Sequence, residues 1–286
     1  MIKLEELVSK IEKLPPMPAI AARLMQLASD PDVDMTTVAS MIARDPAMTA
    51  TLLKLCNSSF YGFQNRVSSV QQAASLFGLR KITQMAVMAL SAKYLVGRTE
   101  GYDLVEGELW KHSVIAASVA EQLAKKCGYP NSGLAFTAGL LQDVGKIIIH
   151  DHVGDKLQEI RDAADKGDIG FMKAEEHVLG FSHAQAGALL MEKWNFPEEL
   201  VDSVRYHHNP LSAKVDVKLA CLSQVADAIT MIMGLGLGAD GLCYTVTEEV
   251  MDYLGLNDSD AIQSIMAGVV DKITDTPEAL LPPKAV

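Results

Sequence analysis

Cysteine and basic charge are scarce in this chain of 286 residues, and each shortage excludes a class of protein. The four cysteines lie far apart and form no CxxC pair, so the sequence predicts neither a zinc knuckle nor a disulfide framework. A reducing compartment fits this pattern. Lysine and arginine number 25 against 36 aspartates and glutamates, which gives a net charge of −11. A chain this acidic lacks the positive field that attracts nucleic acid or anionic lipid, so neither is an expected partner.

Long uninterrupted hydrophobic runs are also missing. The two most apolar stretches are broken by Lys81 and Lys93 in one case, and by Gln224 and Asp227 in the other. Both interruptions come too early for a helix that crosses a bilayer. The opening segment, MIKLEELVSKIEKL, has no continuous apolar core and does not read as a secretory signal. We therefore expect a soluble, cytoplasmic protein.

Helical periodicity dominates the rest of the sequence. Apolar residues recur three and four positions apart over most of the chain, whereas alternating strand patterns are nearly absent, so the sequence predicts an all-α fold. Asp34, Asp45 and Ser69 stand where such segments begin and are expected to be helix N-caps. Gly78 is expected to end the helix that starts at Ser69, as a left-handed terminator.

A segment rich in glycine and acidic residues, 97–108, divides the chain. It separates an expected N-terminal bundle of five or six helices, residues 1–100, from a C-terminal helical bundle, residues 101–286. The first helix is expected within residues 2–14 and stops at the prolines that follow. A second glycine run, 234–241, lacks the spacing of a dinucleotide-binding fingerprint and is interpreted as a loop.

Six polar residues, spread over several predicted helices, carry the side chains that transition metals prefer. They are His112, Asp143, His183, His207, His208 and Asp227. Imidazole nitrogens and carboxylate oxygens that face one cavity of a bundle would suit a transition metal or a dinuclear hydrolytic centre. These residues also have structural interpretations. A histidine can be hydrogen-bonded in the core, and Asp143 can form a local ion pair. His207 and His208 can be cations favoured at a helix C-terminus. Asp227 has apolar neighbours, so it requires a histidine, lysine or metal partner.

Two further features are open between a structural and a binding role. Residues 57–62, NSSFYG, form either a polar helix cap with buried aromatic rings or a lip for a partner. The methionines, among them Met41, Met48, Met85 and Met88, either fill gaps in the core or make an adaptable docking surface.

Several segments, taken in order, resemble the HDOD family, whose members are helical signalling output modules related to the HD-domain and HD-GYP phosphohydrolases. They span residues 14–210 and include LPPMPAIAARLMQLASDPD, SSVQQAASLFGLRKI, LWKHSVIAASVAEQLA, AGLLQDVGK and HVLGFSHAQAGALLMEKWNFPEELVDSVRYHHNP. The resemblance implies an N-terminal helical bundle packed on an HD-domain-like bundle.

The resemblance also implies a set of metal ligands, and one of them is replaced. The implied ligands are His112, Asp143, His183, His207, His208 and Asp227, with Lys146 matching the lysine that follows the HD doublet. Gln142 stands where the doublet has a metal-binding histidine. An amide offers only a neutral carbonyl oxygen to iron, manganese or nickel, so the metal is expected to be weakly bound or absent. The GYP segment is missing as well, because HHNPLSAK stands in its place.

The sequence therefore predicts a stand-alone signal-transduction output or adaptor module of bacterial regulatory type that is non-catalytic. Its expected partners are signalling proteins and a small anionic or nucleotide ligand. The alternative is a metal-dependent phosphohydrolase that acts on a nucleotide or cyclic dinucleotide, with Asp143 and Lys146 near the phosphate.

Overall fold

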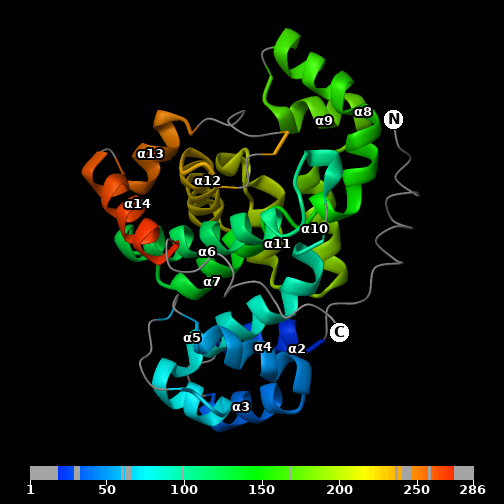
Figure 1. Ribbon diagram of the computed structural model, residues 1–286. Coiled ribbons are helices and arrows are strands. Elements are labelled where there is room, and N and C mark those ends of the chain that lie inside the picture. Colours follow the sequence, from blue (N-terminus) through cyan, green and yellow to red (C-terminus); the bar gives the residue numbers. More distant parts are fainter. Residues whose placement is uncertain are drawn as a thin grey trace.

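The protein is all-α wherever the structure describes it, which confirms the predicted fold class (Figure 1). The computed structural model describes residues 19–28, 33–58, 61, 66–97, 99–167, 169–235, 238–239, 246–256 and 259–273. Within these ranges the extended structure amounts to one isolated bridge between Thr99 and Leu104. The expected first helix and the C-terminal tail lie outside the described residues.

The N-terminal helices form one end of the molecule (Figure 1). They are α2 (Ala19–Ala28), α3 (Met35–Ala43), α4 (Pro46–Cys56) and α5 (Val70–Leu95). Helix α5 packs on α2, α3 and α4, and it also reaches α6 and α7 of the larger C-terminal part. It therefore joins the two parts of the molecule.

The C-terminal part surrounds the predicted polar cluster. Its helices are α6 (Glu108–Lys126), α7 (Ser132–Leu141), α8 (Lys146–Gly167), α9 (Phe171–Leu179), α10 (His183–Lys193), α11 (Glu198–Tyr206), α12 (Val217–Ile232), α13 (Glu248–Leu254) and α14 (Ser259–Ile273), with short 3-10 turns η2 (Glu100–Tyr102) and η3 (Pro210–Ser212). Helix α6 packs on α7 and α12, and α10 packs on α8 and α11. Helices α8 and α9 extend to the far end from α3 (Figure 1).

The predicted helix starts are confirmed by side-chain caps. Asp34 accepts a hydrogen bond from the backbone N–H of Thr36 at 3.1 Å, and Asp45 accepts one from Met48 at 3.0 Å. Ser69 does the same for α5. Each cap satisfies a backbone N–H that has no partner inside its helix.

The helix that starts at Ser69 ends at Gly78, as expected, because Gly78 has a positive φ of 76° with ψ 166°, which is not helical. A second stretch of helix, not foreseen in the sequence, begins directly after it, and α5 covers both stretches as far as Leu95. The residues after the break, among them Ile82, Met85 and Met88, are fully buried. Burial of this apolar segment against the C-terminal helices stabilises the second stretch of helix, so α5 is kinked at the glycine.

Residues 57–62 and the methionines, for which the sequence allowed either a structural or a binding role, have structural roles where the structure describes them. The Asn57 side chain caps α4 by donating to Leu53 O at 2.7 Å, and it exchanges two hydrogen bonds with the backbone of Val67. Met48, Met85 and Met88 are buried, which favours core filling over a docking surface; Met41 is half-buried. Ser59, Phe60 and Gly62 lie outside the described residues.

Two stretches of unusual composition are both packed into the protein. Among the described residues, one stretch, Ser132–His150, is long and apolar enough to cross a membrane, but 78% of that window is buried inside the protein. The dividing segment 97–108 is itself packed, since Tyr102 and Leu104 are at most 1% exposed. The division into residues 1–100 and 101–286 stays a prediction.

Candidate metal centre

The polar residues singled out in the sequence meet in one buried cluster. It contains His112, Gln142, Asp143, Lys146, His183, His207, His208 and Asp227. All but His208 are at most 2% exposed. Helices α6, α8, α10 and α12 supply one member each, the turn from α7 to α8 supplies two, and the residues directly after α11 supply two.

Local backbone structure brings the two halves of the cluster together. Helix α7 ends at Leu141, so Asp143 lies in a tight turn before α8. Gly145 of this turn packs directly on the backbone of His183 and Gly187, where a Cβ atom would have no room. Ser182 caps α10 and forms a capping box with Gln185, which fixes His183 as the first residue of the helix.

The first group of candidate ligands is His112, Asp143 and Asp227. The Nε2 atom of His112 lies 2.9 Å from Asp227 Oδ1, and its Nδ1 atom lies 3.0 Å from the carbonyl oxygen of Leu235. Both neighbours are acceptors, so both ring nitrogens carry protons. Burial alone would lower the pKa of His112, but the adjacent Asp227 carboxylate outweighs burial and raises that pKa.

Gln142 and Lys146 interact with the two carboxylates of this group. Gln142 donates from Nε2 to Asp227 Oδ1 at 2.9 Å. Lys146 Nζ lies 3.1 Å from Asp143 Oδ2. Burial would raise the pKa of Asp143, but the Lys146 ammonium and the neighbouring histidines hold it well below its ordinary value. The local ion pair foreseen for Asp143 and the histidine partner foreseen for Asp227 are therefore both present.

The second group consists of the three imidazoles of His183, His207 and His208. His183 donates from Nδ1 to Glu175 Oε2 at 2.7 Å, and its Nε2 lies 2.9 Å from His208 Nε2. His207 donates from Nδ1 to Val204 O at 2.7 Å. These anchors leave the Nε2 atoms of His183 and His207 as the nitrogens that face the centre.

Burial lowers the pKa of two rings of this second group, His207 and His208, and the nearby imidazoles lower it further. The third ring differs, because the Glu175 carboxylate outweighs burial and raises the pKa of His183. Neutral rings at the end of α11 do not match the alternative in which these two histidines are cations favoured by the helix dipole. Neutral imidazole is instead the form that binds a metal.

The two groups differ in how well they fit a metal ion. In the first, His112 and Gln142 both bond to Asp227, and Lys146 pairs with Asp143, so an ion would have to displace them. Asp143 Oδ2 and Gln142 Oε1 are buried there without a hydrogen-bond partner in the described part of the chain. In the second, His207 Nε2 is buried and has no hydrogen-bond partner among the described residues. The ligand nitrogens of this group lie within 4.8 Å of one another. His183, His207 and His208 therefore fit a divalent transition metal, which would act as a Lewis acid or activate water when bound.

Two buried residues of the site were missed in the sequence. Glu175 and Tyr102 are both 0% exposed, and Glu175 contacts His183 while Tyr102 contacts Glu175. Glu175 shares the helical face of the buried Phe171 and Ala174, and this periodicity was the available signal. Nothing in the sequence around Tyr102 distinguishes it from other aromatic residues.

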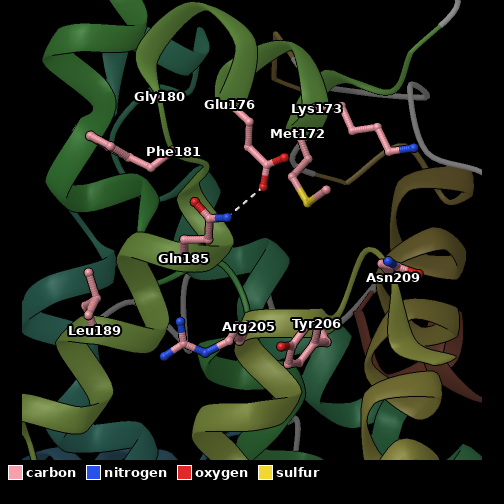
Figure 2. Close-up of a pocket in the computed structure, with 10 residues that line it drawn as sticks. All are labelled: Met172, Lys173, Glu176, Gly180, Phe181, Gln185, Leu189, Arg205, Tyr206 and Asn209. Atoms are coloured by element: carbon pink, nitrogen blue, oxygen red, sulfur yellow. Dashed lines mark hydrogen bonds between the residues drawn. The ribbon is translucent and has the colours of Figure 1, made fainter. Parts of the chain in front are cut away.

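A cleft of about 600 Å³ opens beside the cluster, between α9, α10 and α11 (Figure 2). Glu176 and Gln185 are hydrogen-bonded across it at 2.8 Å, and Arg205 lies on the side opposite Met172. A neighbouring hollow of about 300 Å³ shares Met172, Lys173 and Asn209 with the cleft and is lined by His208 and Gln224. The cleft thus leads to the edge of the three-histidine group.

Comparison with solved structures finds the same fold. An HDOD domain protein with unknown function from Geobacter sulfurreducens matches with a TM-score of 0.75 and 25% identity, over 96% of this chain and 95% of the other. A Marinobacter aquaeolei VT8 protein, provisionally described as a signal transduction protein, matches with a TM-score of 0.76 and 26% identity, over 96% and 65%. A provisionally described phosphohydrolase from Shewanella amazonensis SB2B shares the fold, with a TM-score of 0.71 and 22% identity, over 96% and 98%.

Curated relatives match over shorter parts of their length. A protein of Treponema pallidum (strain Nichols) is 24% identical over 206 residues, which is 71% of this chain and 39% of that protein. A ribonuclease Y of Acholeplasma laidlawii is 29% identical over 120 residues, 42% of this chain and 17% of the enzyme. The chain thus spans well under half the length of these relatives. The profile of the HDOD domain, in contrast, matches residues 14–210, most of the sequence. The chain belongs to the HDOD domain family.

Proposed function

We propose that this chain is a non-catalytic signal-transduction output or adaptor domain that retains a degenerate HD-type centre. The hydrogen bond from Gln142 to Asp227 carries the proposal, because it puts an N–H donor where the HD doublet has an imidazole. A carboxylate can only accept, so the amide nitrogen must face it and the amide oxygen must point away. The first group then keeps His112, Asp143 and Asp227 but lacks the imidazole that the doublet would add.

The ligand and partner assignments of this proposal follow from charge and shape. Lys173 and Arg205 line the cleft beside the three-histidine group, so a small anionic or nucleotide ligand is the proposed input. Signalling proteins are the proposed partners, and the cytoplasm is the proposed location. The net charge of −11 argues against nucleic acid and membrane surfaces as partners.

A metal-dependent phosphohydrolase is the second candidate, because the three-histidine group fits one ion. An ion held by His183, His207 and His208 would supply Lewis acidity, and Lys146 would stabilise charge on a phosphate near Asp143. The similarity to ribonuclease Y and to the Shewanella protein supports this candidate. We rank it second because the first group lacks the imidazole of the doublet.

Gln142→His decides between the two candidates. We expect the purified wild-type chain to hold at most about one equivalent of iron, manganese or nickel and to turn over no nucleotide or cyclic dinucleotide. The variant should bind metal at least about 10-fold more tightly, since it restores an imidazole to the first group. Elemental analysis and a turnover screen measure both quantities.

The matched control is Gln122→His, which makes the same change on α6 and is expected to behave as wild type. Wild-type turnover that disappears in Asp143→Ala would overturn the adaptor proposal. Turnover found only in Gln142→His would support descent from an enzyme.

A further inference from the structure

Tyr102 and Glu175 form a buried chain of contacts that ends on His183. The Tyr102 hydroxyl donates to Glu175 Oε1 at 2.5 Å. Glu175 Oε2 accepts from the backbone N–H of His183 at 3.0 Å and from its Nδ1 at 2.7 Å. The Tyr102 ring also meets the His183 ring edge-on, with 6.2 Å between centroids, and Lys146 Nζ lies 5.3 Å from the centre of the Tyr102 ring. The Glu175 carboxylate is therefore held between a tyrosine and a candidate metal ligand.

This carboxylate decides which nitrogen of His183 faces the centre. Because Glu175 only accepts, the proton of His183 must be on Nδ1. The Nε2 atom is then directed toward His208, at 2.9 Å, and toward Asp143 Oδ1, at 3.5 Å. A carboxylate behind an imidazole ligand fixes the orientation of the ring and raises its basicity.

The backbone of Tyr102 reaches the other group of ligands. Its carbonyl oxygen accepts from Ala239 N at 2.6 Å, in the loop that follows α12. Leu235, which also follows α12, has its carbonyl oxygen 3.0 Å from His112 Nδ1. Tyr102 thus meets the His183 ring through its side chain and bonds Ala239 through its main chain, four residues after the Leu235 that supports His112.

Tyr102 also belongs to the segment that joins the two parts of the molecule. The segment is tied to the end of α5 by a hydrogen bond from Gly107 N to Val96 O at 2.9 Å, and within the segment Tyr102 N donates to Thr99 O at 2.8 Å. Gly101 packs without room for a Cβ atom against the backbone of α8. A displacement of Tyr102 would therefore be passed to the end of α5.

We infer that Tyr102 and Glu175 form a positioning relay that ties His183 to the segment 99–107, so that an ion bound at the three-histidine group changes the stability of this segment. The inference rests on the proposed signalling role and gives it a route from the centre to the N-terminal helices. Neither residue is assigned as a ligand; each acts through His183.

The relay is tested first without metal, by ¹⁵N NMR of the histidine rings in the full chain. Wild type should show His183 with its proton on Nδ1. Glu175→Leu keeps the approximate shape and removes both acceptors, so the proton should redistribute to Nε2. Glu175→Gln keeps an amide oxygen and should restore the wild-type signal. Glu176→Leu is the matched control, because this adjacent acid bonds Gln185 instead of a histidine.

The coupling is tested with Co²⁺ as the probe. We expect Co²⁺ to slow amide hydrogen exchange in residues 99–107 of wild type several-fold, and to do so far less in Tyr102→Phe, which loses one hydroxyl and keeps the ring. Glu175→Leu should weaken Co²⁺ binding by about 10 to 100-fold, as the loss of a partner behind a ligand usually does.

Each outcome bears on one step of the relay. A wild-type His183 signal in folded Glu175→Leu would overturn the relay. Equal Co²⁺ protection of the segment in wild type and Tyr102→Phe, or no Co²⁺ binding by wild type, would overturn the coupling. Nucleotide turnover by wild type would refute the adaptor proposal and leave the His183 result standing, so the two failures are distinguishable.

Discussion

His183 and His207 are presented to the centre by different acceptors. A buried carboxylate holds Nδ1 of His183, whereas a backbone carbonyl of its own helix holds Nδ1 of His207. The Glu175 carboxylate raises the pKa of His183 against the effect of burial, while burial lowers the pKa of His207. His207 is thus the ring more readily available as a neutral ligand, and His183 is the ring whose properties a neighbouring residue controls.

Gly145→Ala tests whether the close approach of two backbones assembles the centre. A methyl group at this position would overlap the carbonyl oxygen of His183 and the N–H of Gly187. We expect the variant to lose about 1–3 kcal/mol of unfolding free energy, as overpacked sites do, together with Co²⁺ affinity. Urea unfolding and calorimetric titration measure the two effects.

The control for this variant is Gly97→Ala. A methyl group added at Gly97 would have no atom within 4 Å, so the unfolding free energy should change by less than about 0.5 kcal/mol. Equal behaviour of the two variants would show that the turn at Gly145 tolerates side chains and does not set the geometry of the centre.

The individual residues of the site were only partly foreseeable. Asp227 could be recognised because an acid among apolar neighbours must have a partner, and that partner is His112. Glu175 could not be distinguished from Glu176 by residue type, and the one signal in the sequence was the helical periodicity that buries Glu175 with Phe171 and Ala174. Convergence of side chains from α6, α10 and α12 is a property of the packed structure. No spacing along the chain encodes it, so the resemblance to the family was needed to connect them.

At the scale of elements, the predictions that held are the ones that depend on local chemistry. Asp34, Asp45 and Ser69 each bond an N–H within three residues, and such caps can be read from the sequence. Helix α8, in contrast, continues through the charged stretch after His150 to Gly167, where the sequence carries no such local signal. The break at Gly78 belongs with the local predictions that held, whereas the second stretch of helix that follows it depends on tertiary packing, which local propensity does not indicate.

Ser182→Ala tests whether a helix cap also serves the centre. Ser182 accepts from Gln185 N at 3.4 Å, while the Gln185 side chain accepts from Ser182 N at 3.2 Å. Loss of the cap should lower the unfolding free energy by about 1 kcal/mol. Since α10 begins at His183, the same change should also alter the ¹⁵N signal of that ring.

Ser69→Ala provides the comparison, because it removes the same residue from the same role at the start of α5. It should cost a similar free energy, measured by urea unfolding, and leave the His183 signal unchanged. If Ser182→Ala also left that signal unchanged, the cap would be a matter of stability alone.

At the scale of the whole molecule, the N-terminal and C-terminal parts share one continuous core. Buried apolar residues from α2 through α14 belong to a single cluster, and the segment predicted to divide the chain contributes Tyr102 and Leu104 to it. An ion pair crosses the same junction: Lys81 of α5 lies 2.9 Å from Glu121 of α6. Lys81 also lies over the ring of Phe136 on α7, 5.2 Å from its centre. Charge and packing therefore hold α5 against the part that contains the centre.

Glu121→Gln should reveal this junction through the pH dependence of stability. Burial raises the pKa of Glu121, but Lys81 and Lys125 outweigh burial and lower the pKa below its ordinary value. A carboxyl group whose pKa is lower in the folded state adds stability above its unfolded pKa, about 4.3, and loses that contribution as the pH falls through the folded value. The free energy of unfolding of the variant should therefore be about 0.5–1 kcal/mol lower than that of wild type near neutral pH, and this difference should shrink below a pH of about 4.

Urea unfolding across this pH range measures the difference. The control is Glu159→Gln. The pair between Glu159 and Lys156 is exposed on a single helix, so its loss should have no measurable effect on stability. A difference that stayed constant with pH would mean that the junction depends on the packing of Glu121 and not on its charge.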